Sequence, residues 1–289
     1  MKPDDFDFAS QFFKDRSGLV LTREKAYLLE SRLMPVARKK GLKSLEELIA
    51  AMRVGRDSVL LREVTEAMTI NESFFFRDIK PFDLFRNTVL PRFLQSRAAK
   101  KTLRVWCAAC SSGQEPYSLA MILREEAARL AGWRNEIVGT DISSEMVAKA
   151  KAGLYSQFEV QRGLPIQLLV KYFKKEGDLW QIDASLRAMV RYREYNLLHD
   201  LKGIGVFDVV FCRNVLIYFD NETKAKVLAQ IRGIMPDDGI LFLGGAETVL
   251  GISDHFKPIP DLRGLYMPTE RSSATGTSTL FPAGSAPGS

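Results

Sequence analysis

Leu103-Arg-Val-Trp-Cys-Ala108 is a short apolar run that predicts a buried strand, and the small, polar segment Ala109-Cys-Ser-Ser-Gly113 follows it directly. A helical pattern then extends from Glu115 to Leu130, and a second strand pattern, Glu136-Ile-Val-Gly-Thr-Asp141, comes after it. Strands that alternate with helices in this way indicate a parallel sheet with helices on both faces. Such sheets bind ligands at the carboxyl ends of their strands, so this stretch also indicates where a site would lie.

The alternation continues downstream and is interrupted once. A helix at 144–152, capped by Ser143, comes next, and the later elements are a buried strand at 206–212, a helix at 221–234 and a strand at 240–243. In the block of about residues 158–195, two runs have the pattern of short strands, Leu179–Asp183 and Met189–Tyr195. We interpret this block as a small antiparallel subdomain whose second strand leads back into the main sheet. The expected fold class is therefore α/β.

Residues 1 to about 70 contain no strand pattern. Apolar residues recur there at spacings of three and four, which is typical of helices, in Phe6–Phe13, Ala26–Ala37 and Leu45–Met52. Ser44 and Glu47 fit a capping box at the start of the third helix. Pro35 is expected to kink the second helix or to end it near Met34. A small all-helical domain is therefore predicted ahead of the sheet domain.

Length, composition and charge narrow the class of protein. The 289 residues suggest about two domains. Their 41 Lys and Arg exceed 35 Asp and Glu by a net charge of +6, which permits an acidic partner without naming one. No apolar run approaches the ~20 residues that cross a bilayer, and no signal core follows Met1, so a cytoplasmic protein without membrane insertion is predicted. The segment 269–289 is rich in Ser, Thr, Gly, Ala and Pro and is predicted to be disordered.

Three cysteines and two histidines allow little thiol or metal chemistry. Cys107 and Cys110 have the spacing of a redox pair. We favour the alternative, two small buried residues at the end of a strand, because their loop has another use. His199 and His255 lie far apart and neither belongs to a ligand pair, so no metal site is predicted.

The loop after the first strand distinguishes two classes of nucleotide ligand. A pyrophosphate needs a Gly-x-Gly-x-x-Gly turn at a helix N-terminus, whereas this loop has one glycine, Gly113, with Glu115 close behind it. A carboxylate there would repel pyrophosphate and suit a cationic ligand, although it would serve equally as an acid in the first turn of a helix. Asp141, at the end of the second strand, could accept hydrogen bonds from ribose hydroxyls.

Two further segments place polar side chains beside apolar runs. Arg77 follows Asn71-Glu-Ser-Phe-Phe-Phe76, and its guanidinium could hold a ligand carboxylate through two parallel hydrogen bonds. At least two of the three phenylalanine rings are expected to be core. Arg213 and Asn214 directly follow a buried strand, where this architecture places chemistry, although a loop cap and a surface charge would give the same pattern.

Five motifs, in this order, resemble the CheR-type chemotaxis receptor methyltransferases. They are Asn-Glu-Ser-Phe-Phe-Phe-Arg (71–77), Cys-Ser-Ser-Gly-Gln-Glu-Pro-Tyr-Ser (110–118), Gly-Thr-Asp-Ile-Ser (139–143), Asn-Leu (196–197) and Cys-Arg-Asn-Val-Leu-Ile-Tyr-Phe (212–219). The resemblance covers about Phe6 to Met267. It implies a helical receptor-facing domain over residues 1–70 and a Rossmann-like S-adenosylmethionine-dependent methyltransferase domain over residues 71–268.

That family transfers methyl groups from S-adenosylmethionine to glutamate side chains in the helical cytoplasmic domain of bacterial chemoreceptors, which leaves S-adenosylhomocysteine. The resemblance implies cofactor-binding roles for Asn71, Ser73, Arg77, Glu115, Asp141, Asn196, Leu197, Arg213 and Asn214. It places Tyr218 near the methyl group, and Tyr218 and Arg213 are the catalytic candidates. A glutamate carboxylate is already ionised at neutral pH, so alignment matters more than a general base. Arg213, or a basic residue in the stretch Arg92–Arg97, is expected to steer it.

The sequence departs mildly from the family pattern at Ser73, Ser112 and Gln114. Between Phe173 and Leu179 it has only Lys-Lys-Glu-Gly-Asp. Family members that dock on a receptor's C-terminal pentapeptide tend to have a longer, glycine-rich loop there. The resemblance, with this departure, therefore predicts a pentapeptide-independent enzyme, which we expect to be a monomer.

Two other functions stay open at the level of sequence. The first is a nucleic-acid methyltransferase with a basic N-terminal module, although Arg213-Asn-Val-Leu216 replaces the Asn/Asp-Pro-Pro-Tyr motif of amino-group methylases. We therefore expect no nucleic-acid partner. The second is a cofactor-binding regulator that no longer transfers methyl groups.

The positive charge is concentrated in one segment. Residues 23–43 hold seven basic and two acidic residues, a net charge of +5. Lys25, Arg32 and Lys39 recur every seven residues and would fall near one face of a helix that Pro35 only kinks. A solvated face would show the same pattern, but the acidic substrate that the resemblance implies favours substrate docking.

Overall fold

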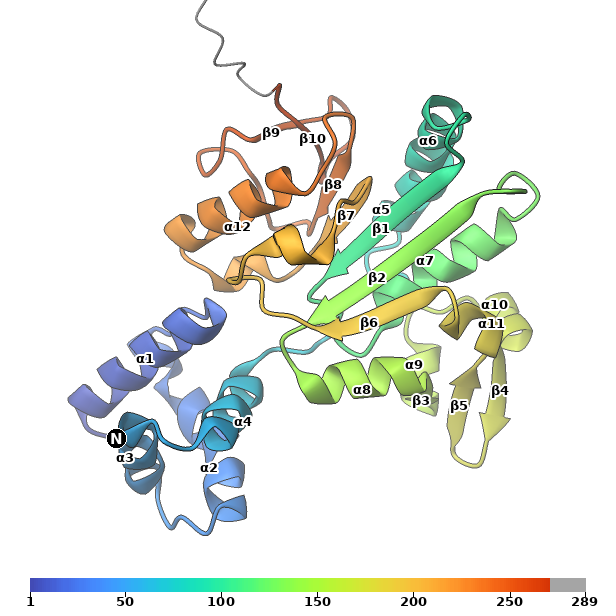
Figure 1. Cartoon of the computed structure of the whole chain (residues 1–289). Coiled ribbons are helices and arrows are strands. Elements are labelled where there is room, and N and C mark those ends of the chain that lie inside the picture. The colour runs from blue at the N-terminus through green and yellow to red at the C-terminus, as the bar shows by residue number, and fades with distance from the viewer. Residues whose placement is uncertain (271–289) are drawn as a thin grey trace, which may run out of the picture.

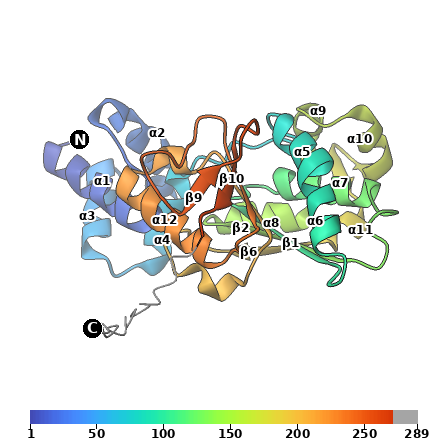
Figure 2. The ribbon, with the colours of Figure 1, turned by 90° about the horizontal axis from the view of Figure 1, so that it is seen from above.

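The computed structural model describes residues 1–270, which form a helical N-terminal part and a sheet-containing part joined by a linker at residues 69–79 (Figure 1). Seen from above, the N-terminal helices lie at one end of the molecule and a small subdomain at the other, with the main sheet between them (Figure 2). The predicted disordered tail lies outside the described residues, except for Thr269 and Glu270.

The N-terminal helices each bury one apolar face in a shared core, as their spacing predicts. The elements are α1 (Pro3–Ser17), the 3-10 turn η1 (Arg23–Lys25), α2 (Ala26–Lys39), α3 (Leu45–Val54) and α4 (Ser58–Met68). Phe13, Leu33 and Leu48 have no exposed surface in this core. The core is distinct from those of the sheet, so this part of the chain supplies its own hydrophobic interior.

One local prediction in this part needs correction, and one of two alternatives for another is excluded. Ser44 Oγ accepts from the Glu47 amide at 3.2 Å, as a capping box requires, but the Glu47 carboxylate accepts from the amide of Lys43 instead of Ser44. Pro35 does not end α2 near Met34, because the helix continues to Lys39. Leu33 and Ala37, two positions before and after Pro35, are fully buried, so packing of the apolar face outweighs the hydrogen bond that proline removes.

The main sheet has seven strands in the order β6-β2-β1-β7-β8-β10-β9. Their bounds are β1 (Thr102–Ala108), β2 (Arg134–Asp141), β6 (Val190–Glu194), β7 (Val209–Cys212), β8 (Ile240–Leu243), β9 (Phe256–Pro258) and β10 (Leu265–Pro268). Strands β6, β2, β1, β7 and β8 run parallel, as predicted, while β10 is antiparallel to both of its neighbours. The carboxyl ends of five strands therefore meet at one edge.

Helices cover both faces of the main sheet, because successive side chains of a strand point in opposite directions. Val105 and Cys107 belong to the core on one face, and Trp106 and Ala108 to the core on the other. The first core includes α5 (Lys80–Leu84), the π-helical turn η2 (Phe85–Val89), α6 (Leu90–Ser96), α7 (Gln114–Glu125) and α8 (Ser144–Ala152). The second includes η3 (Leu201–Ile204), η4 (Leu216–Tyr218) and α12 (Asn221–Gly233). The predicted extension of α7 to Leu130 is wrong, because the helix ends at Glu125 and the amides of Ala127 and Arg129 bond to carbonyls only three residues earlier.

The small antiparallel sheet forms as predicted. Its strands, in the order β3-β5-β4, are β3 (Leu154–Ser156), β5 (Leu179–Ile182) and β4 (Phe173–Glu176). Around them lie the helices α9 (Gln157–Gln161), α10 (Ile166–Tyr172) and α11 (Ala184–Arg187). Strand β3 starts before the block of residues 158–195, whereas β6 returns to the main sheet beside β2.

Candidate active site

One cavity lies at the carboxyl ends of β1, β2, β6 and β7, against the linker at residues 69–79. It encloses about 990 Å³, counting its open mouth. All ten residues to which the family resemblance gave cofactor or catalytic roles line it: Asn71, Ser73, Arg77, Glu115, Asp141, Asn196, Leu197, Arg213, Asn214 and Tyr218. Folding therefore brings together side chains from the linker, the first turn of α7 and the ends of three strands.

Asp141 is held at the end of β2 by two backbone amides. Its Oδ2 accepts from the amide of Ser111 at 2.8 Å, and its Oδ1 accepts from the amide of Ser143 at 2.9 Å. Burial raises the pKa of the Asp141 carboxyl, while these hydrogen bonds act in the opposite direction. Each carboxylate oxygen has more than one acceptor position. The group can therefore also accept from the hydroxyls of a bound ligand.

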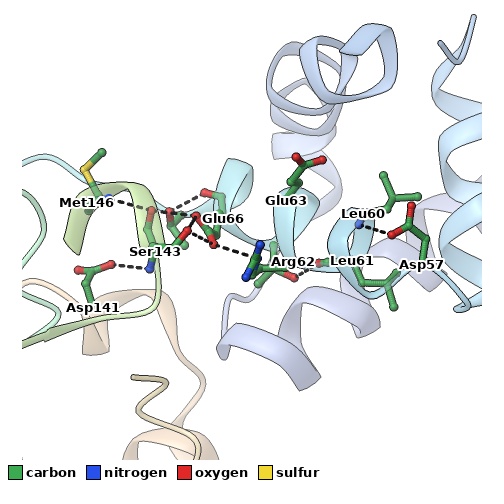
Figure 3. A network of polar contacts seen from close by, with 12 residues as sticks. Asp57, Leu60, Leu61, Arg62, Glu63, Glu66, Asp141, Ser143 and Met146 are labelled. Atoms are coloured by element: carbon green, nitrogen blue, oxygen red, sulfur yellow. Dashed lines mark hydrogen bonds and ion pairs between the residues drawn. The ribbon is translucent and has the colours of Figure 1, made fainter. Parts of the chain in front are cut away.

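Helix α4 of the N-terminal part reaches this corner of the cavity. The Glu66 carboxylate accepts from the hydroxyls of Ser143, at 3.2 Å, and Ser144, at 3.0 Å (Figure 3). Arg62, one turn earlier, lies 3.8 Å from Glu66. Because the Ser143 amide also donates to Asp141, a single serine connects α4 to the carboxylate at the end of β2. No sequence pattern singled out Glu66 for this contact.

A buried ion pair forms the wall of the cavity nearest to β7. Arg213 Nη1 donates to Glu115 Oε2 at 2.7 Å, and Nη2 donates to Asp78 Oδ2 at 2.7 Å and to the Arg77 carbonyl at 2.9 Å. Arg213 is 5% exposed and Glu115 is 9% exposed. Burial raises the pKa of the Glu115 carboxyl, and the adjacent guanidinium opposes that rise. Glu115 thus brings a carboxylate to the cavity, while both amino nitrogens of Arg213 are already engaged.

The linker takes a strained course past this ion pair. Phe76, Asp78 and Ile79 have φ angles of 51°, 69° and 50°, and a non-glycine residue in this left-handed region costs about 1–3 kcal/mol. These bends direct the Arg77 carbonyl and the Asp78 carboxylate at Arg213. The Arg77 guanidinium itself donates to the Glu72 carbonyl at 2.7 Å and lines the cavity. The strained backbone of the linker is therefore the part that presents these two acceptors to Arg213.

The phenylalanines of the linker anchor it to the rest of the molecule. The expected core packing of two rings is confirmed. Phe75 lies edge-on to Tyr155 with 5.0 Å between the ring centres, and Phe76 lies edge-on to Phe82 with 5.3 Å between the ring centres. Phe74 instead lies beneath the guanidinium of Arg162, which is 4.3 Å from the ring centre. These contacts fix the backbone that carries Arg77.

Glu247 organises the loop after β7, and the sequence analysis missed it. Its carboxylate accepts hydrogen bonds from four backbone amides, those of Asn214 at 2.8 Å, Val215 at 3.0 Å, Ile217 at 3.2 Å and Gly244 at 2.6 Å. Asn214 has a φ of 59°, so the loop turns sharply where these bonds hold it. The sequence did contain a signal for Glu247. It follows the predicted strand at 240–243, and an acidic residue after a parallel strand lies at the edge of the sheet where ligands bind.

The segment after α1 closes another side of the cavity, which no sequence pattern indicated. Leu19 lines the cavity. Asn196 Nδ2 donates to the Arg16 carbonyl at 2.6 Å, and the Val20 amide donates to the Tyr218 carbonyl at 2.9 Å. The Asn196 side chain, besides lining the cavity, therefore bonds the N-terminal part to the sheet domain.

The three basic residues assigned to docking have different surroundings. Arg32 Nη1 donates to the carbonyls of Met68 and Thr69, both at 3.0 Å, and so holds the start of the linker. Lys39 pairs with Glu63 at 2.9 Å, although its side chain is 71% exposed. Lys25 is exposed at the end of η1, before α2 begins. Of the three, Arg32 is thus committed to an internal contact.

The stretch Arg92–Arg97 does not reach the cavity. Arg97 pairs with Asp208, at 3.4 Å, and Asp238, at 2.5 Å, which precede β7 and β8. These contacts lie at the amino ends of the strands, on the edge of the sheet opposite to the cavity. The prediction that a basic residue of this stretch steers the acceptor carboxylate is therefore wrong.

The cysteines behave as packing residues. Cys107, Cys110 and Cys212 are buried free thiols, and burial raises the pKa of each well above its ordinary value. The thiolate that redox chemistry requires is therefore disfavoured. Within residues 1–270, no group of three or more His, Cys, Asp or Glu residues could hold a metal ion. None of the helices in that range has the length and apolar character needed to cross a membrane.

Comparison with known proteins gives consistent matches over both parts of the chain. Residues 4–69 match the CheR methyltransferase all-alpha domain, and residues 71–264 match the CheR methyltransferase SAM binding domain. Chemotaxis protein methyltransferase Cher2 of Pseudomonas putida is 38% identical over 259 residues, which cover 88% of this chain and 94% of the relative. Chemotaxis protein methyltransferase 1 of Pseudomonas aeruginosa is 41% identical over 260 residues, with the same coverage of both chains.

The donors and acceptors of the cavity fit S-adenosylmethionine. That molecule presents ribose hydroxyls, a cationic amino group and sulfonium, and an anionic carboxylate. The cavity presents carboxylates, on Asp141 and Glu115, and a guanidinium, on Arg77, which are the complementary groups. The chain therefore belongs to the CheR methyltransferase family, and it is an S-adenosylmethionine-dependent chemotaxis protein methyltransferase.

Proposed function

We propose that this enzyme transfers methyl groups to glutamate side-chain carboxylates in the helical cytoplasmic domain of bacterial chemoreceptors, and that it acts in the cytoplasm as a monomer. One observation carries the proposal. The cavity combines buried carboxylates with two arginines and two tyrosines, and the described residues that line it include no histidine that could act as a general base. Relatives described as chemotaxis protein methyltransferases support a substrate from that signalling system.

A glutamate acceptor needs alignment rather than deprotonation, because its reference pKa of ~4.3 keeps it ionised at neutral pH. When bound, S-adenosylmethionine supplies an electrophilic methyl carbon, which gains a bond to a carboxylate oxygen as its bond to sulfur breaks and leaves the electron pair on sulfur. The enzyme's residues must hold the reacting atoms about 3–3.5 Å apart and in line.

The polar groups of the cavity have holding roles in this proposal. Asp141 would accept hydrogen bonds from the ribose hydroxyls, Glu115 would face the amino group and Arg77 would hold the carboxylate of the cofactor. Asn71, Ser73, Asn196, Leu197 and Asn214 complete the wall of the cofactor site. Arg213 acts through Glu115 and Asp78, so we assign it a positioning role rather than direct contact with the acceptor.

Tyr218→Phe is expected to lower kcat by about 100-fold, the effect of a misplaced acceptor carboxylate, with cofactor affinity unchanged. Burial raises the pKa of the Tyr218 phenol, so its hydroxyl stays protonated at neutral pH and can donate to the acceptor. Labelled-methyl transfer gives kcat, and calorimetric titration with S-adenosylhomocysteine gives affinity. Tyr172→Phe, in the small subdomain, is the matched control. A wild-type kcat for Tyr218→Phe would remove Tyr218 from the catalytic machinery.

The helical N-terminal part is proposed as the receptor-facing surface. Residues 23–43 carry a net charge of +5, and both Lys25 and Lys39 project into solvent. Attraction to an acidic helical substrate would raise the rate of encounter and would weaken with added salt. Arg32 contributes to this surface indirectly, because it fixes the linker.

A receptor-tail pentapeptide is expected to bind more weakly than about 1 mM, which corresponds to about 4 kcal/mol. Strands β4 and β5 are joined by only Gly177 and Asp178, which leaves no extended loop to hold a peptide. Strand β4 is also an edge strand that exposes Lys174 and Lys175, and exposed lysines discourage pairing with a further strand. Calorimetric titration tests this, and micromolar affinity would contradict pentapeptide independence.

The proposed function is tested with methyl-labelled S-adenosylmethionine and a receptor cytoplasmic fragment, followed by treatment with alkali. Methyl esters of glutamate release volatile labelled methanol, which is the expected result. A methylase of nucleic-acid bases would give no such release, and a regulator without turnover would bind S-adenosylhomocysteine but transfer no label. Either of those outcomes would overturn the proposal.

A further inference from the structure

A second cavity lies beside the first, on the side of β8 and β10. It encloses about 1190 Å³, open solvent included, and is lined by the start of α5, the loop at residues 244–248 and the turn before β10. Strand order explains its position, because β8 and β10 follow β7 in the sheet, whereas the first cavity extends over β7, β1, β2 and β6. The two cavities therefore lie next to each other along the same edge.

The wall between the two cavities is thin and polar. Asp78 lines the second cavity and pairs with Arg213, which lines the first. Glu247 lines the second cavity and accepts from the amide of Asn214, which lines the first. A Cβ on Gly244 would lie 2.9 Å from Asn214 Nδ2, so the backbone on one side touches the side chain on the other. A group in the second cavity is thus separated from the first cavity by a single layer of side chains and backbone.

The charged side chains of the second cavity that lack a strong polar partner are both cations. Its two acids are engaged, Asp78 by Arg213 and Glu247 by four backbone amides. Its two cations are Lys80, which is exposed, and Arg263, whose Nη2 makes one long contact of 3.4 Å with the Gly245 carbonyl. Neither cation has an ion pair with any residue in the range 1–270. A cavity with this balance favours an anionic occupant.

We infer that the second cavity is the entry site for the acceptor, with Lys80 and Arg263 as positioning residues for the acidic segment around the glutamate that is methylated. The inference rests on the proposed function and deepens it. Lys80 and Arg263 would also supply the cationic contact for the acceptor. Arg213 cannot provide it because it is paired with two carboxylates, and Arg97 cannot because it lies at the opposite edge of the sheet. Exposed Ile79, beside Lys80, offers an apolar contact for a substrate helix at the rim.

The double variant Lys80→Gln, Arg263→Gln is expected to raise KM for a receptor cytoplasmic fragment by about tenfold, equivalent to about 1.4 kcal/mol. The kcat and the affinity for S-adenosylhomocysteine should stay within about twofold of wild type, a split that general structural damage would not produce. Reversal of both charges to Glu should raise KM further, and added salt should reduce the difference between variant and wild type.

The matched control is Lys100→Gln, Arg134→Gln, which removes two exposed cations at the amino ends of β1 and β2. An unchanged KM in the Lys80/Arg263 variant, or an equal rise in the control, would overturn the entry site. The proposed function fails separately, if the wild-type enzyme itself releases no labelled methanol from the methylated fragment. A receptor fragment whose acidic residues next to the acceptor are replaced by Gln should show little response to the double variant.

Discussion

Arg213→Ala is expected to abolish measurable methyl transfer and to lower the free energy of unfolding by about 3–5 kcal/mol, the usual cost of removing one partner from a buried ion pair. Arg213 is 5% exposed, and its partner Glu115 would be left as an uncompensated buried carboxylate. Asp78 and the Arg77 carbonyl would lose the donor that holds the strained linker in place. Urea unfolding measures the stability change, and labelled-methyl transfer measures activity.

A second variant separates charge burial from catalysis. Arg213→Met combined with Glu115→Gln removes both charges and should recover most of the lost stability, because neutral groups of similar size avoid the desolvation cost. It should not recover activity, since the cavity then lacks the Glu115 carboxylate. Wild-type stability of Arg213→Ala, or turnover by the double variant, would contradict the role assigned to the pair.

Glu247→Ala is expected to reduce kcat/KM by at least about 100-fold, because the loop that carries Asn214 and Tyr218 loses its acceptor and the site residues are misplaced. Four backbone amides bond to this one carboxylate, and a buried donor without a partner costs about 1–3 kcal/mol. Rearrangement and entering water will satisfy some of them, so we expect the free energy of unfolding to fall by about 2–4 kcal/mol. Steady-state kinetics and urea unfolding measure the two effects.

Glu247→Gln tests the same assignment more gently. It keeps one carbonyl oxygen as an acceptor but turns the other position into a donor, so its loss of activity should be intermediate. Glu176→Gln, on the exposed hairpin of the small sheet, is the matched control and should behave as wild type. If Glu247→Ala keeps full activity, the loop after β7 is held by other contacts and Glu247 is not a positioning residue.

The parallel strands of the main sheet, several of the helices and most of the cavity could be predicted from the sequence, but β3, β4, β9 and β10 were not. Apolar periodicity reports which face of a segment is buried, and it located the strands at 103–108, 136–141 and 206–212 within a few residues. The residues that follow those strands, among them Asp141 and Arg213, do line one cavity. This succeeds because parallel strands bring their carboxyl ends to one edge, whatever the details of packing.

Only the tertiary structure decided which charges are occupied and what surrounds the site. Periodicity did not show that Arg213 is held by Glu115 and Asp78, or that Glu247 binds the loop after β7. Nor did it show that Lys80 and Arg263, which are 183 positions apart, line one cavity without an acidic partner in the described part of the chain. The physical reason is that local sequence determines how a segment folds and which side it buries. The partner of a charged side chain depends on which distant segments the packed helices and the order of the strands bring beside it.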